Sequence, residues 1–166
     1  MSDFRILGID PGLNTTGYGL IDIKKNKASL VKFGHIRTKA KESLSQRLHV
    51  IFNSLDAIIA DFKPDRVAIE DIFYADNVKT AIVMGHARGA AIVAATKNNA
   101  SVTEFTAREV KMSVVGNGAA SKNQVSFMVS NILRIKEKIT PEDASDALAV
   151  ALCQMNRLQL EAKGLS

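Results

Sequence analysis

The order of strand-like and helix-like stretches restricts the fold of this sequence more than any other feature. Three strand-like runs come first, over residues 4–10, 15–23 and 28–37, with a Pro11-Gly12 turn after the first run. These runs predict an antiparallel β-meander. A helix-spaced apolar pattern follows over residues 44–62 and opens with a capping box of Ser43 and Gln46.

The second half of the chain alternates strands and helices. We predict a fourth strand over 66–70, a helix from Asn77 to about residue 97 and a fifth strand over 101–105, an order that places these strands in parallel. Capping boxes at Thr106 and Ser121 predict two further helices, and we expect Thr140 to cap a last helix with Pro141 at its first position. The predicted fold class is α/β, a mixed five-stranded sheet with helices on its faces.

Composition narrows the class of protein. The 166 residues, 46% apolar and 23% charged, predict a single domain over 1–166. The sequence has no membrane-spanning stretch and no secretory signal, so we expect a cytoplasmic location. The net charge of +5 suits a polyanionic partner, although many proteins without one are equally basic. The single cysteine, Cys153, is expected in the core, and with three scattered histidines it excludes thiolate or histidine metal sites.

Four carboxylates carry the chemistry. Asp10 and Glu70 each end an apolar strand, where ligands of open α/β sheets collect, although Asp10 also suits an Asx-turn. Asp143 and Asp146 share one face at the start of the last helix, where acidic residues also favour the helix dipole. If the two strands are neighbours, all four groups meet at one sheet edge. Two Mg²⁺ ions would stabilise such a cluster and support phosphodiester hydrolysis.

Six motifs in order across nearly the whole chain resemble the RuvC family of bacterial Holliday junction resolvases. These motifs are Ile6-Leu7-Gly8-Ile9-Asp10-Pro11-Gly12, Gly17-Tyr18-Gly19, Ala68-Ile69-Glu70, Gly85-His86-Ala87-Arg88-Gly89, Val114-Val115-Gly116-Asn117-Gly118 with Ser121-Lys122, and Asp143-Ala144-Ser145-Asp146-Ala147-Leu148-Ala149. The resemblance implies a ribonuclease H-like fold and a homodimer. It further implies a Mg²⁺-dependent endodeoxyribonuclease, with Mn²⁺ as a substitute, that makes paired symmetric nicks in four-way junction DNA alongside the RuvA and RuvB branch-migration proteins.

The resemblance also implies roles for individual residues. Asp10, Glu70, Asp143 and Asp146 would be the metal-binding, catalytic carboxylates, and Lys111 and Lys122 would lie by the scissile phosphate. From the residues alone, a solvated charge at a helix end is the more common role of such lysines. The DNA-contacting residues it implies are Phe73, Tyr74, Asn77, Arg88, Asn117 and Lys122. For Phe73, core packing is the alternative to base stacking.

Several residues depart from the family pattern near the expected DNA face. The departures are Asp71, Asp76, His86 and Ala119, and all but His86 make this face less positive. A lysine- and arginine-rich stretch over 22–49 either compensates for this or protects a solvated edge strand.

Three other functions are alternatives to the resolvase. The first is a nucleotide-binding protein, but a P-loop after Gly12 fails because position 18 is tyrosine instead of lysine, and an actin-like ATPase needs a second lobe. A non-catalytic junction-binding protein would not need four carboxylates. Another ribonuclease H-like nuclease, acting on a different nucleic acid, would share the same catalytic residues and is distinguished only by the motifs outside the site.

Overall fold

A mixed β-sheet forms the centre of the protein. The structure is a computed structural model, and it describes residues 3–71 and 78–165. The strands are β1 (Phe4–Asp10), β2 (Thr15–Lys24), β3 (Lys27–Arg37), β4 (Arg66–Asp71) and β5 (Ser101–Thr106), in the spatial order β3-β2-β1-β4-β5. β1, β2 and β3 pair antiparallel, whereas β4 is parallel to both β1 and β5. The predicted mixed five-stranded sheet is confirmed.

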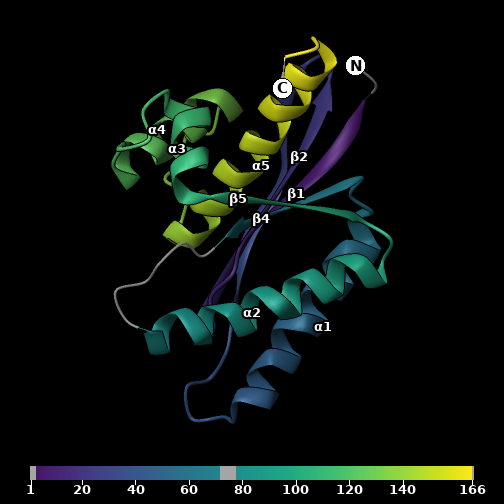
Figure 1. Ribbon diagram of the computed structural model, residues 1–166, viewed down its shortest axis with the longest axis vertical. Coiled ribbons are helices and arrows are strands. Elements are labelled where there is room, and N and C mark those ends of the chain that lie inside the picture. The colour runs from purple at the N-terminus through teal and green to yellow at the C-terminus, as the bar shows by residue number, and fades with distance from the viewer. Residues whose placement is uncertain (1–2, 72–77, 166) are drawn as a thin grey trace.

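Helices cover both faces of this sheet, as predicted (Figure 1). α1 (Leu44–Phe62) and α2 (Val78–Lys97) lie on one face, and α3 (Ala107–Val115), α4 (Lys122–Leu133) and α5 (Glu142–Ala162) lie on the other. The α2 residues that pack toward the sheet are small, namely Ala87, Ala91, Ala94 and Ala95. Within the described ranges, none of these helices combines the length and the apolar character needed to cross a membrane.

Local side-chain caps start three of the helices as the sequence predicts. Ser43, Thr106 and Ser121 each accept a backbone hydrogen bond from the residue three positions on and complete a capping box. The expected cap at Thr140 is wrong. Pro141 is extended and occupies the N-cap position of α5, where no side chain caps the helix. The first turn instead carries Glu142 and Asp143, whose negative charge favours the helix dipole.

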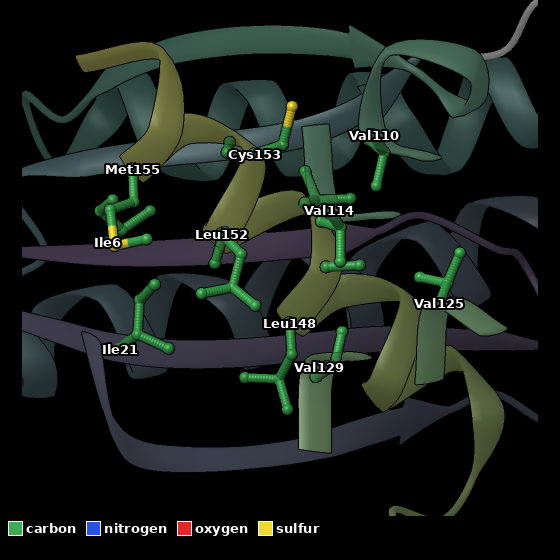
Figure 2. Packing of buried hydrophobic residues seen from close by; sticks show 14 of the residues in the cluster. Ile6, Ile21, Val110, Val114, Val125, Val129, Leu148, Leu152, Cys153 and Met155 are labelled. Carbon is green, nitrogen blue, oxygen red and sulfur yellow. The ribbon is translucent and has the colours of Figure 1, made fainter. Parts of the chain in front are cut away.

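α5 is the most buried helix of the fold. It lies between the sheet and the α3–α4 pair, so that Leu148 and Leu152 have sheet residues on one side and α3 and α4 residues on the other (Figure 2). Cys153 lies in this core, as expected, and burial raises the pKa of its thiol to about 11. A helix buried on most of its surface has little freedom to shift relative to the sheet.

Glycines let the α5 backbone approach the sheet directly. A Cβ atom added at Gly8 of β1 would overlap the Ala147 carbonyl oxygen and lie 2.8 Å from the Ala151 backbone nitrogen. A Cβ atom added at Gly17 of β2 would overlap the Asp143 carbonyl oxygen. Any larger residue at these two positions would therefore push α5 away from the sheet.

We predict that Gly8→Ala destabilises the protein. Because the new methyl group meets backbone atoms that cannot rotate away, the free energy of unfolding should fall by about 1–3 kcal/mol or more, the usual cost of overpacking. Denaturant unfolding measures this change. Adding Ala151→Gly removes only a side-chain contact, so it should not restore stability. A full recovery in the double variant would contradict the backbone contact as the cause.

Candidate active site

The four carboxylates singled out from the sequence line one cavity. Asp10 ends β1 and Glu70 lies at the same end of β4, its parallel neighbour, while Asp143 and Asp146 lie at the start of α5. The cavity has a volume of about 340 Å³, and Lys111 of α3 and Lys122 of α4 also line it. The condition set by the sequence argument, that the two strands be neighbours, is therefore met.

The contact between α5 and the sheet explains why the two pairs of carboxylates meet. Gly17 is the β2 residue paired with Asp10, and it is also the residue on which the Asp143 backbone rests. Gly17, which has no side chain, therefore lies between the end of β1 and the first turn of α5. The spacing between Asp10 and the α5 carboxylates is set by backbone packing.

The cavity destabilises the charged forms of Asp10 and Glu70. Burial is the largest cause that raises the pKa of Asp10 to about 8, and repulsion from Glu70, Asp146 and Asp143 adds to it. Burial and then repulsion from Asp146 raise the pKa of Glu70, while a hydrogen bond with Asp10 acts in the opposite direction. A cation placed among these groups would offset both the lost hydration and the repulsion.

The two cavity lysines differ in their contacts. Lys122 donates a hydrogen bond from Nζ to Oδ2 of Asp146 at 3.0 Å, and this bond raises the pKa of the lysine. The Lys122 side chain is still 69% exposed, so it retains access to solvent. Lys111 lines the cavity from α3. Lys122 is therefore an exposed charge at the start of α4 that also pairs with one carboxylate of the cavity.

The carboxylates fit a hard divalent cation by their chemistry, although they do not form a finished ligand shell. Oxygen donors of this kind are what Mg²⁺ and similar ions select. In ranges 3–71 and 78–165, no three histidine, cysteine, aspartate or glutamate side chains lie close enough together to hold a metal ion as they stand. Asp146 is bonded to Lys122 through Oδ2, so an ion bound at this carboxylate would compete with the Lys122 ammonium.

The predicted DNA-contacting residues are less fully described. Phe73, Tyr74 and Asn77 lie outside the described residues, as does the departure at Asp76. Asn117 accepts a hydrogen bond from the Ala119 backbone and lines a hollow that shares Lys111 with the carboxylate cavity. These DNA contacts stay predictions.

Arg88 has partners that the sequence argument missed. It pairs with Glu104 of β5 and with Asp71 at the end of β4. Neither pairing follows from local spacing, because each joins residues that only the sheet order brings together. The one available signal was Asp71 itself, a second acidic residue directly after Glu70.

One basic residue of the stretch over 22–49 is not on the protein surface. Arg47 is buried and hydrogen bonds the side chains of Thr38 and Asn14. It therefore ties the start of α1 to the turn that follows Asp10, and it is not available to compensate for charge on a DNA face. Lys27 and Lys32 are exposed on β3, an edge strand of the sheet.

Comparison with known proteins identifies the family. The family model described as crossover junction endodeoxyribonuclease RuvC matches residues 6–154. The chain belongs to this family. RuvC of Alkaliphilus oremlandii is 45% identical over 148 residues, which cover 89% of this chain and 90% of that protein. RuvC of Heliobacterium modesticaldum is 47% identical, also over 148 residues, covering 89% and 91%.

Solved RuvC structures share the fold. Thermus thermophilus RuvC superposes with a TM-score of 0.88 at 31% identity, covering 95% of this chain and 96% of that one. The same protein in complex with a Holliday junction substrate has a TM-score of 0.90 at the same identity and coverage. The sheet order, and with it the ribonuclease H-like RuvC fold predicted above, is confirmed.

The raised pKa of Asp10 predicts how stability depends on pH without metal. Folding raises this pKa from 3.8 to about 8, so the folded protein holds a proton that the unfolded chain releases, and stability falls as pH rises through this range. Asp10→Asn removes the effect. In EDTA, its melting temperature should exceed that of the wild type by more at about pH 8 than at about pH 5.

Asp61→Asn is the matched control for this experiment, because Asp61 is an exposed carboxylate on α1 that does not line the cavity. Its difference from the wild type should stay nearly constant over the same pH range. A melting temperature of Asp10→Asn that tracks the wild type at every pH would contradict the electrostatic description of the cavity.

Proposed function

We propose that this chain resolves four-way DNA junctions by paired symmetric nicks, and that it hydrolyses each phosphodiester at the cavity lined by Asp10, Glu70, Asp143 and Asp146. The observation that carries the proposal is the meeting of these four carboxylates, from three separate elements, in one cavity bordered by Lys111 and Lys122. Membership in the RuvC family supports an endodeoxyribonuclease that acts on crossover junctions.

The carboxylates would hold two Mg²⁺ ions, for which Mn²⁺ can substitute. Bound there, the ions would activate the attacking water and neutralise the leaving oxygen of the phosphodiester. Asp10 must lose its proton to act as a charged ligand, and an ion bound at Asp146 would repel the Lys122 ammonium and favour opening of the Lys122–Asp146 bond. Lys122, once released, remains within reach of the cavity with its charge free for the phosphate.

Positive charge near the scissile phosphate is the proposed role of Lys111 and Lys122. A fixed cation stabilises the negative charge that develops on the phosphate oxygens in the transition state. The two lysines come from different helices, α3 and α4, on the same side of the sheet. Phe73, Tyr74, Asn77 and Asn117 are proposed as DNA contacts on the basis of the motifs alone.

The function is tested with a labelled synthetic four-way junction and a linear duplex of the same sequence. Wild-type protein with Mg²⁺ should nick the junction at symmetric positions in two strands and leave the duplex intact on a denaturing gel, and EDTA should stop all cleavage. Equal cleavage of the linear duplex would assign the chain to another class of ribonuclease H-like nuclease. Binding without cleavage would make it a junction-binding protein.

Isosteric variants show whether the cavity performs the reaction. Asp10→Asn, Glu70→Gln and Asp146→Asn should each abolish cleavage, while junction affinity in EDTA stays near that of the wild type, because phosphate contacts supply the affinity. Asp61→Asn is again the matched control and should cut normally. Near-normal rates in two of the three variants would contradict the assignment of the site.

We also propose a two-fold homodimer paired through α2. No atom of the described residues lies close to where a Cβ at Gly85 or Gly89 would be, and Val78, Ile82 and Val93 are 73%, 56% and 56% exposed. Packing of this side of α2 on the sheet is the alternative, but the small residues on the opposite side of the helix, Ala87, Ala91, Ala94 and Ala95, are the ones in the core. Two symmetric cuts need two active sites, which a closed dimer supplies.

The dimer is tested by Gly89→Leu. If a second α2 packs on this face, a leucine should shift the protein toward monomer in sedimentation at micromolar concentration, while circular dichroism stays unchanged because no atom of the described residues lies close to the position. Ala57→Leu, on the exposed side of α1, is the matched control and should leave the dimer intact. A wild-type protein that sediments as a monomer, and binds each junction as one subunit, would contradict the proposal.

The partners implied by the family motifs are the RuvA and RuvB branch-migration proteins. The proposed location is the cytoplasm, where an enzyme acting on chromosomal junctions would work. We propose that residues 1–166 form a single nuclease domain, because both helical layers pack on one sheet.

A further inference from the structure

Arg88 joins three elements beside the active site. Its Nε lies 3.1 Å from Oε1 of Glu104 and its Nη2 lies 2.5 Å from Oε2 of the same carboxylate, a two-point contact between α2 and β5. Nη2 also lies 3.2 Å from Oδ1 of Asp71 in β4. The three side chains are only about one-third exposed, so water screens these ion pairs less than pairs on an open surface.

Asp71 is a fifth carboxylate at the catalytic cavity. It is the last residue of β4, it follows Glu70 directly, and it lines the same cavity as the four proposed metal ligands. Its backbone pairs with Thr106, the residue that caps α3, so the strand end on which it lies is fixed. The Asp71 side chain can still rotate about its own bonds, so its carboxylate can either pair with Arg88 or bind an ion in the cavity.

A fifth free carboxylate would disturb this cavity. The site already raises the pKa of Asp10 and Glu70 through burial and mutual repulsion. Another carboxylate next to Glu70 would offer a cation an additional oxygen ligand in the wrong place. Arg88 opposes this because Glu104 holds its guanidinium in a fixed orientation, with Nη2 toward Asp71.

We propose that Arg88 is a positioning residue that keeps the Asp71 carboxylate in an ion pair at the wall of the catalytic cavity, so that cations there bind only Asp10, Glu70, Asp143 and Asp146. The inference rests on the proposed function. It gives Arg88 a role other than the DNA contact expected from the sequence, since Nε and Nη2 of its guanidinium already bind carboxylates. It also explains how the chain tolerates an aspartate at position 71.

The experiment compares wild type, Arg88→Met, Asp71→Asn and the double variant in two assays. The first measures Mn²⁺ affinity without DNA, by titration of the free ion. Arg88→Met should bind Mn²⁺ about threefold to tenfold more tightly, because the released Asp71 adds a ligand charge. The second measures single-turnover cleavage of a four-way junction, which Arg88→Met should slow by about tenfold or more, because the released Asp71 carboxylate would draw the cation away from its productive position.

The decisive result is rescue. Asp71→Asn should return both the Mn²⁺ affinity and the cleavage rate of Arg88→Met to within about threefold of the wild type, because the neutral amide no longer competes for the cation. Asp71→Asn alone should behave like the wild type. Tighter metal binding together with slower cleavage separates the proposal from simple structural damage, which would weaken both.

Lys97→Met provides the matched control, because Lys97 is an ion-paired cation on the same helix that does not line the cavity. It should change neither the Mn²⁺ affinity nor the cleavage rate. Circular dichroism and the melting temperature confirm that each variant is folded.

Three outcomes would overturn the proposal. The first is a double variant that stays as slow as Arg88→Met. The second is weaker Mn²⁺ binding in Arg88→Met that Asp71→Asn does not reverse. The third is a loss of junction affinity in Arg88→Met, measured in EDTA, together with a slope of log affinity against log salt concentration that is smaller by about one. That result would make Arg88 a phosphate contact. If the wild type fails to cut junctions, the proposed function fails, but the Mn²⁺ titrations still decide the role of Arg88.

Discussion

The backbone contact between α5 and the β1–β2 pair is the constraint on which the site depends. Gly8 and Gly17 leave no side chain between the strands and the helix, so the start of α5 comes to rest beside the end of β1. α3 and α4 pack on the other side of α5 and hold it in place. Asp143 and Asp146 therefore reach Asp10 through rigid packing, which gives a catalytic site the precise support it needs.

The charges around this site are arranged so that the carboxylates stay together without a bound cation. Asp10 retains a proton to a higher pH than an ordinary aspartate, because burial and its acidic neighbours raise its pKa. Asp146 is paired with Lys122, and Asp71 shares Arg88 with Glu104. The site is therefore stable in a protonated and ion-paired form. Metal binding would replace this form with one in which the carboxylates are charged and Lys122 is released.

The features predicted correctly from the sequence are those that depend on residues close together in the chain. The order of strands and helices followed from periodicity, and the caps at Ser43, Thr106 and Ser121 followed from motifs of four residues. Thr140 failed because Pro141 took the cap position. The pairing of Arg88 with Asp71 and Glu104 and the contact of Gly17 with α5 were beyond this reasoning. Both join residues far apart in the chain, and they appear only once the sheet order and helix layers are known.

The central claim is that Asp10, Glu70, Asp143 and Asp146 form one cation site. It is tested most directly by a crystal structure of the protein with Mn²⁺, measured at a wavelength where manganese scatters anomalously. We expect anomalous peaks inside the cavity, bounded by oxygen atoms of these four side chains, with Lys122 moved away from Asp146. A cavity without an anomalous peak at saturating Mn²⁺, with the Lys122–Asp146 bond intact, would contradict the account.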